Sequence, residues 1–123
     1  MRRRDLIRTL KKELKFFEQQ GYGHSFRSLW RPTLLFRDSL TCLNFRRSDR
    51  LLPCSKCQLI QFVPEQKRDL FMPCHHIPLD GAGRTIAQLY QSGTQQDLDA
   101  AFRAWLYSTI EKLEKEEWSH ENS

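Results

Sequence analysis

A cysteine and histidine cluster constrains the fold of this chain more than any other feature of its sequence. Cys54 and Cys57 form a Cys-x2-Cys pair, and sixteen residues separate this pair from Cys74, which His75 and His76 follow directly. Two thiolates separated by two residues can bind one ion from a tight turn, and a second chain segment can complete a tetrahedral site. The spacing therefore predicts a metal site that joins two separate segments of the chain.

The fourth ligand of this site stays open at the level of sequence. Cys42 would give a four-cysteine site, whereas a histidine would give three cysteines and one histidine. In an extended segment Cys74 and His76 share a face and His75 points away, which favours His76 over His75. Cys42 is also a candidate for simple burial, because free cysteine is among the most buried residue types. The predicted metal ligands are Cys54, Cys57 and Cys74, with His76 and Cys42 as competing fourth ligands.

Zinc is the predicted metal, because it accepts mixed cysteine and histidine ligands. Pro53–Cys57 also resembles the knuckle turn of zinc ribbons, a resemblance that covers these five residues alone. The four cysteines would also suit an iron–sulfur cluster, but their spacing matches neither bacterial nor plant-type ferredoxins. A thioredoxin-like dithiol is disfavoured, because that motif opens a helix, whereas this pair precedes a strand-like run. Zinc is therefore the expected cofactor, and an iron–sulfur cluster is the alternative.

Length and composition are those of one small globular domain, 1–123. Eight Phe, three Trp and three Tyr favour a packed core over disorder. No apolar run approaches the roughly 20 residues of a membrane helix, and no apolar stretch follows the basic start, as it would in a signal peptide. We therefore expect a cytoplasmic protein with no membrane span. In that reducing compartment, clustered cysteines bind metal more often than they form disulfides.

The charge is distributed unevenly along the chain. Residues 1–60 carry 14 Lys and Arg against 5 Asp and Glu, whereas residues 61–123 carry 6 against 10. A basic half is typical of a surface that binds nucleic acid or an acidic protein, although the same half can also pack on the acidic one. The cations of the first predicted helix are the expected contacts: Arg3, Arg4, Arg8, Lys11, Lys12 and Lys15.

Apolar periodicity predicts an α+β fold. Leu6, Leu10, Leu14 and Phe17 recur at helical spacing and predict a helix over 3–19. Short β-prone runs between turn signals predict a small antiparallel sheet that carries the metal site within 24–79. The runs are Ser25–Trp30, Thr33–Phe36, Leu40–Phe45 and Gln58–Val63, with Cys74–Leu79 as a further short strand. After a turn at residues 80–83, two helices are expected within 84–118, the second preceded by an approximate capping box at Thr94–Asp97.

These features together favour a small metal-stabilised binding or accessory protein over an enzyme. Its basic N-terminal half would contact nucleic acid or an acidic protein surface. The alternative is an iron–sulfur redox or electron-transfer protein that uses all four cysteines. An enzyme is disfavoured, because the sequence supplies no phosphate-binding loop, no His-Glu-x-x-His zinc motif and no Gly-x-Ser-x-Gly nucleophile motif.

Overall fold

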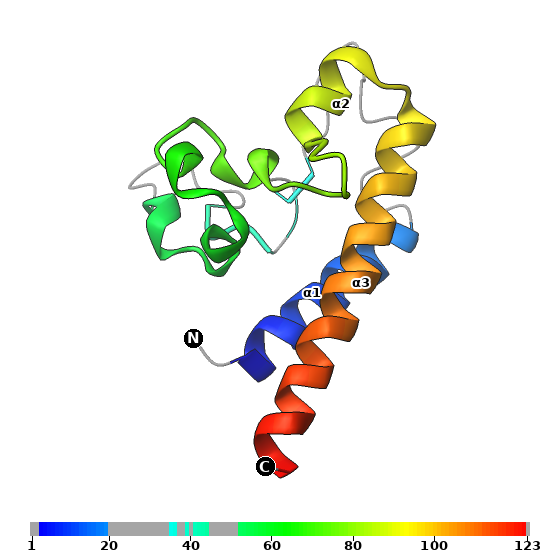
Figure 1. Ribbon diagram of the computed structural model, residues 1–123. Coiled ribbons are helices and arrows are strands. Elements are labelled where there is room, and N and C mark those ends of the chain that lie inside the picture. Colours follow the sequence, from blue (N-terminus) through cyan, green and yellow to red (C-terminus); the bar gives the residue numbers. More distant parts are fainter. Residues whose placement is uncertain (1–2, 20–34, 37–38, 40, 45–51, 123) are drawn as a thin grey trace.

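The described part of the chain is helical. The computed structural model describes residues 3–19, 35–36, 39, 41–44 and 52–122. Its three α-helices are α1 (Arg3–Glu18), α2 (Ile86–Ser92) and α3 (Gln95–Asn122). Four short 3₁₀ turns precede α2, at Cys54–Lys56, Gln58–Phe62, Glu65–Lys67 and Pro73–His76. Figure 1 shows α1 crossing beside the long α3, with the short turns gathered to one side.

The predicted α+β fold is wrong for the described residues, which contain no β-strand and no sheet. Gln58–Val63, the clearest predicted strand, instead forms a 3₁₀ helix over Gln58–Phe62. Leu59 and Val63 are buried while Gln61 between them is exposed, whereas all three would share one face of a strand. A short apolar run is compatible with either state, and here the packing favours the helical one.

The remaining predicted strands are not found where the structure describes them. Residues 41–44, within the run Leu40–Phe45, form turns and a bend. Pro73–His76 is a 3₁₀ turn, so Cys74 does not begin a strand. Ser25–Trp30 and the first half of Thr33–Phe36 lie outside the described residues, and Leu35 and Phe36 lie in a turn.

Packing between α1 and α3 forms the main apolar contact of the described chain. α1 lies within the helix predicted over 3–19, and its buried side chains recur at the predicted spacing. The rings of Phe17 and Phe102 meet edge to face, with centroids 5.1 Å apart. Phe102 also meets Phe36, again with centroids 5.1 Å apart, so the segment after α1 shares this core. These contacts join three parts of the chain through one buried ring.

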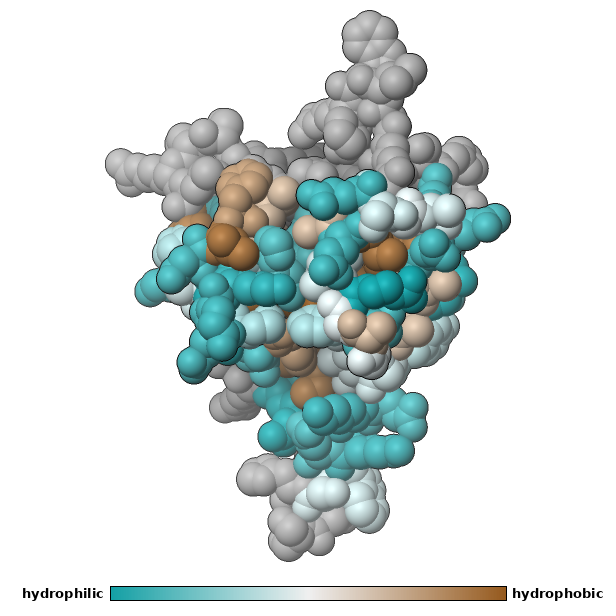
Figure 2. Space-filling view, turned by 45° about the horizontal axis from the view of Figure 1, so that its top comes forward, coloured by the Kyte–Doolittle hydropathy of each residue, from teal (hydrophilic) through white to brown (hydrophobic). Residues whose placement is uncertain are grey.

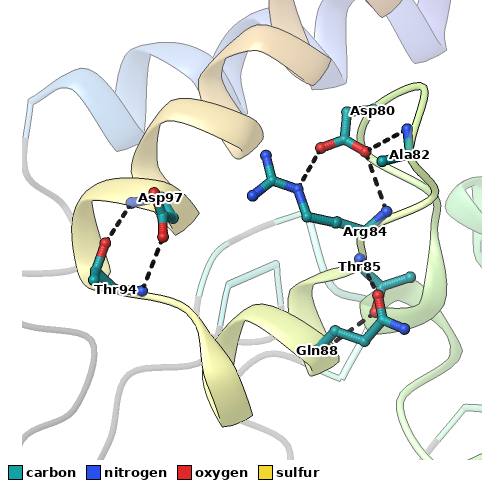
Figure 3. A network of polar contacts seen from close by, with 7 residues as sticks. All are labelled: Asp80, Ala82, Arg84, Thr85, Gln88, Thr94 and Asp97. Atoms are coloured by element: carbon teal, nitrogen blue, oxygen red, sulfur yellow. Dashed lines mark hydrogen bonds and ion pairs between the residues drawn. The ribbon is translucent and has the colours of Figure 1, made fainter.

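Both C-terminal helices begin at reciprocal side-chain caps (Figure 3). The Thr85 hydroxyl accepts from the Gln88 backbone N–H at 3.2 Å, while the Gln88 side chain accepts from the Thr85 N–H. The Thr94 hydroxyl accepts from the Asp97 N–H at 3.0 Å, and the Asp97 carboxylate accepts from the Thr94 N–H. Each box satisfies backbone donors that a helix start leaves unpaired. The capping residues therefore define where α2 and α3 begin.

A buried carboxylate connects α1 to the segment that contains Cys42. Glu13 is 1% exposed and lies on the apolar face of α1. Its Oε1 accepts hydrogen bonds from the hydroxyls of Ser39, at 2.6 Å, and Thr41, at 2.7 Å. Because a buried carboxylate needs hydrogen-bond donors, these two hydroxyls hold Ser39 and Thr41 against the helix.

Some apolar side chains remain at the surface. Figure 2 shows a face on which hydrophobic residues appear in small separate areas among hydrophilic ones. Among the described residues, Phe71 is 77% exposed and Leu70 is 46% exposed, both just before the turn that carries Cys74. Single exposed apolar residues are common on proteins and need no partner to explain them.

Candidate functional site

All four cysteines line one small cavity. The cavity has a volume of about 40 Å³, and its walls include Cys42, Cys54, Cys57 and Cys74 together with Phe36 and Leu59. The four residues come from three separate segments of the chain. None of them forms a disulfide. The structure therefore brings the sequence-predicted thiols to one place.

The Cys-x2-Cys pair lies on two consecutive 3₁₀ turns. The Cys57 backbone N–H donates to the Cys54 carbonyl at 2.9 Å, which closes the first turn. The Cys57 carbonyl then accepts from the Ile60 N–H at 3.1 Å and starts the second. Cys54 is exposed and Cys57 is half-buried. The tight turn therefore brings two thiols to the cavity, one at the surface and one below it.

Cys74 reaches the cavity from the turn Pro73–His76. Met72, which precedes this turn, has a left-handed backbone with φ of 48°, and its carbonyl accepts from the His75 N–H at 3.0 Å. Such a backbone is uncommon for a residue other than glycine and redirects the chain sharply. This change of direction at Met72 comes directly before the turn on which Cys74 lies. From that turn Cys74 reaches the cavity that Cys54 and Cys57 also line.

Hydrogen bonds of Asn44 hold the Cys42 segment in place. The Asn44 backbone N–H donates to the Cys42 sulfur over 3.4 Å. The Asn44 side chain donates to the Leu52 carbonyl at 2.9 Å and accepts from the Leu52 N–H at 2.7 Å. This two-way pairing ties the Cys42 segment to the chain just before the Cys-x2-Cys pair. The Glu13 contacts described above anchor the same segment from α1.

Burial and mutual proximity raise the pKa of the inner thiols. Burial raises the pKa of Cys74 to about 12, with smaller contributions from the other three cysteines. The pKa of Cys57 is also raised, mainly by burial, while the Leu59 backbone N–H bonded to its sulfur opposes the rise. Thiols with raised pKa values are protonated at neutral pH unless a cation stabilises the thiolate.

The two histidines do not share the position of the thiols. His75 is 3% exposed, its Nε2 lies 2.8 Å from the Leu35 carbonyl, and its ring lies 5.6 Å from that of Tyr90. His75 therefore links the Leu35 backbone to α2. His76 is half-buried and is not among the residues that line the thiol cavity.

The prediction of a formed metal site is not supported by the structure. Across the residues described, no group of three or more His, Cys, Asp and Glu side chains is arranged to hold a metal ion. The α+β description is therefore corrected, and so is the expectation that the described residues hold a formed metal site. The thiols line one cavity, but their sulfurs do not yet surround one point.

The predicted basic contacts divide into two sets on α1. Arg3 pairs with Glu116 and Glu117, over 3.5 and 3.6 Å. Arg4 reaches Glu117 over 3.6 Å, and Lys11 reaches Glu114 over 3.0 Å. These three cations face the acidic end of α3, so part of the basic half packs on the acidic half. The second set is Arg8, Lys12 and Lys15, all of them exposed.

Comparisons with known proteins supply no relative. No family model, no curated protein and no solved structure matches the chain. Within the described ranges, none of the helices has the length and apolar character needed to cross a membrane. The function must therefore be argued from the residues themselves.

Sequence reasoning overlooked Glu13. It lies three residues after Leu10 and four before Phe17, on the stripe that predicts the buried face of the helix. A carboxylate at such a position is a signal that polar partners will be buried with it. Ser39 and Thr41 supply those partners, and they lie next to Cys42.

Proposed function

We propose that this chain is a non-enzymatic binding protein that contacts nucleic-acid phosphates through the face of α1 carrying Arg8, Lys12 and Lys15. One observation carries the proposal: these three exposed cations lie together, on the side of α1 opposite its buried face. We call this set the basic stripe. The acidic residues of α3 pair with the neighbouring cations and leave the stripe facing away from them.

Helix geometry supports this grouping. At about 100° per residue, positions 8, 12 and 15 fall within an arc of roughly 60°. Leu6, Leu10 and Phe17 are all buried, and they are centred on the opposite side of the same helix. With a rise of about 1.5 Å per residue, the stripe extends over roughly 10 Å of helix. That length places several positive charges along a short stretch of a polyanion.

A shallow hollow runs beside the stripe. It has a volume of about 390 Å³, and the described residues that line it all come from α1: Arg4, Ile7, Arg8, Lys11, Lys12 and Lys15. Ile7 is 9% exposed, so the walls are formed mainly by long cationic side chains, whose aliphatic stems make most of the exposed lining apolar. An extended anionic chain would contact the charged ends of these side chains.

The composition of this face favours phosphate over an acidic protein. Protein interfaces obtain most of their binding energy from a few buried aromatic, apolar or arginine anchors in pockets. Phosphate contacts require only positive charge and hydrogen-bond donors. The basic stripe offers three cations and no exposed aromatic ring. An acidic protein surface is therefore the weaker candidate, and the experiment below separates the two.

The test measures affinity for mixed-sequence oligonucleotides, single-stranded and double-stranded, as a function of salt. We expect binding at low salt, and in the triple variant R8Q/K12Q/K15Q we expect the slope of log affinity against log salt to fall by about three units. The matched control is K67Q/K112Q/K115Q, which removes the same charge from other exposed or half-exposed sites. The control is expected to bind as the wild type does.

Three results would overturn this proposal. One is no detectable affinity for either oligonucleotide at low salt. The second is an equal loss in both triple variants, which would mean that net charge alone matters. The third is preferential binding of an acidic peptide such as polyglutamate, in competition with the oligonucleotide, which would assign the stripe to a protein partner.

A further inference from the structure

We infer that the thiols of Cys42, Cys54, Cys57 and Cys74 together bind one zinc ion, with Cys42 and not His76 as the fourth ligand. All four residues line one cavity of about 40 Å³. A cavity needs about 10–15 Å³ to admit a water molecule, so this one has room for a metal ion. Four sulfur ligands at one place are typical of structural zinc.

The position of the histidines decides the fourth ligand. His75 is committed to the Leu35 carbonyl and stands beside Tyr90, away from the thiols. His76 does not line the cavity, whereas Cys42 does. The expectation that favoured His76 assumed an extended segment, but a 3₁₀ turn occupies Pro73–His76. In that turn, the alternation of side chains that placed Cys74 and His76 on one face does not apply.

Two backbone N–H groups already point at the sulfurs. The Asn44 N–H donates to the Cys42 sulfur at 3.4 Å, and the Leu59 N–H donates to the Cys57 sulfur. In both cases the donor is two residues after the cysteine. Such N–H···S bonds stabilise the thiolate form that a metal requires. Two independent segments therefore prepare their cysteines in the same way.

Binding requires a change of side-chain rotamer. In the described residues no three of the candidate ligands yet surround one point. Cys54 is exposed, and rotation of an exposed thiol needs no repacking of the core. Lys56, on the same turn, is exposed and adds a positive charge beside a site that would carry four thiolates and one divalent ion. Because no three thiols yet surround one point, the exposed Cys54 and at least one of the three half-buried thiols must turn toward the ion.

The spacing of the cysteines favours one ion over an iron–sulfur cluster. Both [2Fe–2S] and [4Fe–4S] cores are held by cysteine thiolates, as a structural zinc ion can be. The four cysteines lack the spacing of the bacterial and plant-type ferredoxin motifs. The single-ion assignment therefore agrees with the sequence, and the metal analysis below tests it.

The first experiment uses the wild-type chain. Elemental analysis and an absorption spectrum of protein purified without oxygen should give one zinc per chain and no visible colour. Iron together with visible absorption would indicate an iron–sulfur cluster and would overturn the assignment of zinc. The absence of any bound metal, together with no uptake of added zinc, would overturn the inference.

A second measurement on the wild type identifies the ligands without any substitution. Zinc is titrated calorimetrically into metal-free protein in two buffers of different ionisation enthalpy, which gives the number of protons released. Four protonated thiols should release about four protons, whereas three thiols and a neutral histidine should release about three. Cobalt(II) substitution then reports the ligand set through the position of its visible bands. A count near three, with bands of a mixed sulfur and nitrogen site, would overturn the role of Cys42.

Variants complete the test. C42S should lower zinc affinity by at least about tenfold, as loss of one ligand from a closed tetrahedral site does. The matched control H76N should bind zinc as tightly as the wild type. The opposite pattern, a loss in H76N and none in C42S, would overturn the inference. C42S and H76N both leave the basic stripe intact. A loss of zinc binding in these variants can therefore be distinguished from a loss of oligonucleotide binding.

Discussion

The paired helices α1 and α3 and the thiol segment, residues 52–77, differ in how they are held together. α1 and α3 bury apolar side chains against each other, with Phe17 at the end of α1 against Phe102 in the first third of α3. The thiol segment has only short 3₁₀ turns, and its buried apolar side chains include Leu59, Val63 and Ile77. Short turns bury little surface each, so such a segment depends on contacts with the rest of the chain or on a cross-link.

The two regions meet at aromatic side chains. Phe62, from the thiol segment, meets Trp105 of α3 edge to face, with ring centroids 5.3 Å apart. Phe36 meets the same indole ring at 6.0 Å. The helices therefore form a packed platform, which the thiol segment contacts through a few aromatic rings. Four substitutions test this division, in order of decreasing expected cost.

Phe102→Ala should be the most damaging of the four. It removes a fully buried ring that contacts both Phe17 and Phe36, and such a change costs about 3–5 kcal/mol of unfolding free energy. Urea denaturation measures the loss. Tyr107→Ala, at a side chain that is 51% exposed on the same helix, should cost less than about 1 kcal/mol. Equal losses at both positions would show that the helix pair is not the packed platform.

Glu13→Ala should loosen the attachment of the Cys42 segment. It removes the acceptor shared by the buried hydroxyls of Ser39 and Thr41, at an expected cost of about 1–3 kcal/mol. Glu13→Gln keeps an acceptor oxygen and should cost less. Zinc affinity should fall in the Ala variant, because Cys42 is no longer held near the other thiols. Unchanged stability in Glu13→Ala would contradict the anchoring role.

Thr94→Ala should weaken the helical region alone. The substitution removes the hydroxyl that accepts from the Asp97 N–H and should cost about 1 kcal/mol. Gln96→Ala, at an exposed position in the same first turn, is the control. Thermal unfolding should show the loss, while zinc uptake stays as in the wild type. A fall in zinc affinity would show that the two regions are more closely coupled than their contacts indicate.

Lys11→Gln should have the smallest effect on stability. Its ion pair with Glu114 is exposed on both sides, and such pairs contribute about 0.5 kcal/mol or less. Lys12→Gln, one residue on, should leave stability unchanged but reduce the salt dependence of oligonucleotide binding by about one unit. The two neighbouring lysines thus distinguish a charge that pairs within the protein from a charge that contacts the oligonucleotide. Equal effects of both substitutions on stability and on the salt dependence of binding would remove that distinction.

The helices could be predicted from sequence because their signals lie within the helical segments themselves. Leu6, Leu10 and Phe17 repeat at helical spacing over several turns, and Thr94 and Asp97 stand at a helix start. The region 24–79 could not be predicted in the same way. Runs such as Gln58–Val63 are too short to separate a strand from a helical turn, and tertiary packing decides between them. The predicted sheet failed for this reason.

The thiols show which part of the candidate site could be predicted from the sequence. The Cys54–Cys57 spacing predicts two thiols on a tight turn, and the structure places both, with Cys74, at one cavity. The spacing alone could not choose between Cys42 and His76, because that choice depends on how the Cys42 segment packs. The packing depends in turn on Glu13, whose carboxylate is buried by distant hydroxyls. Contacts between residues so far apart in the chain leave no local pattern.

The pairing of Arg3, Arg4 and Lys11 with the end of α3 also affects how this protein meets other molecules in solution. These ion pairs cancel charge on one flank of α1, so the positive potential is strongest over its outer face. A charged patch of this kind accelerates diffusional encounter and biases the orientation of approach, with an effect that falls as ionic strength rises. If the basic stripe binds an anion as proposed, the acidic end of α3 would bias the direction from which that anion arrives, by pairing with the cations beside the stripe.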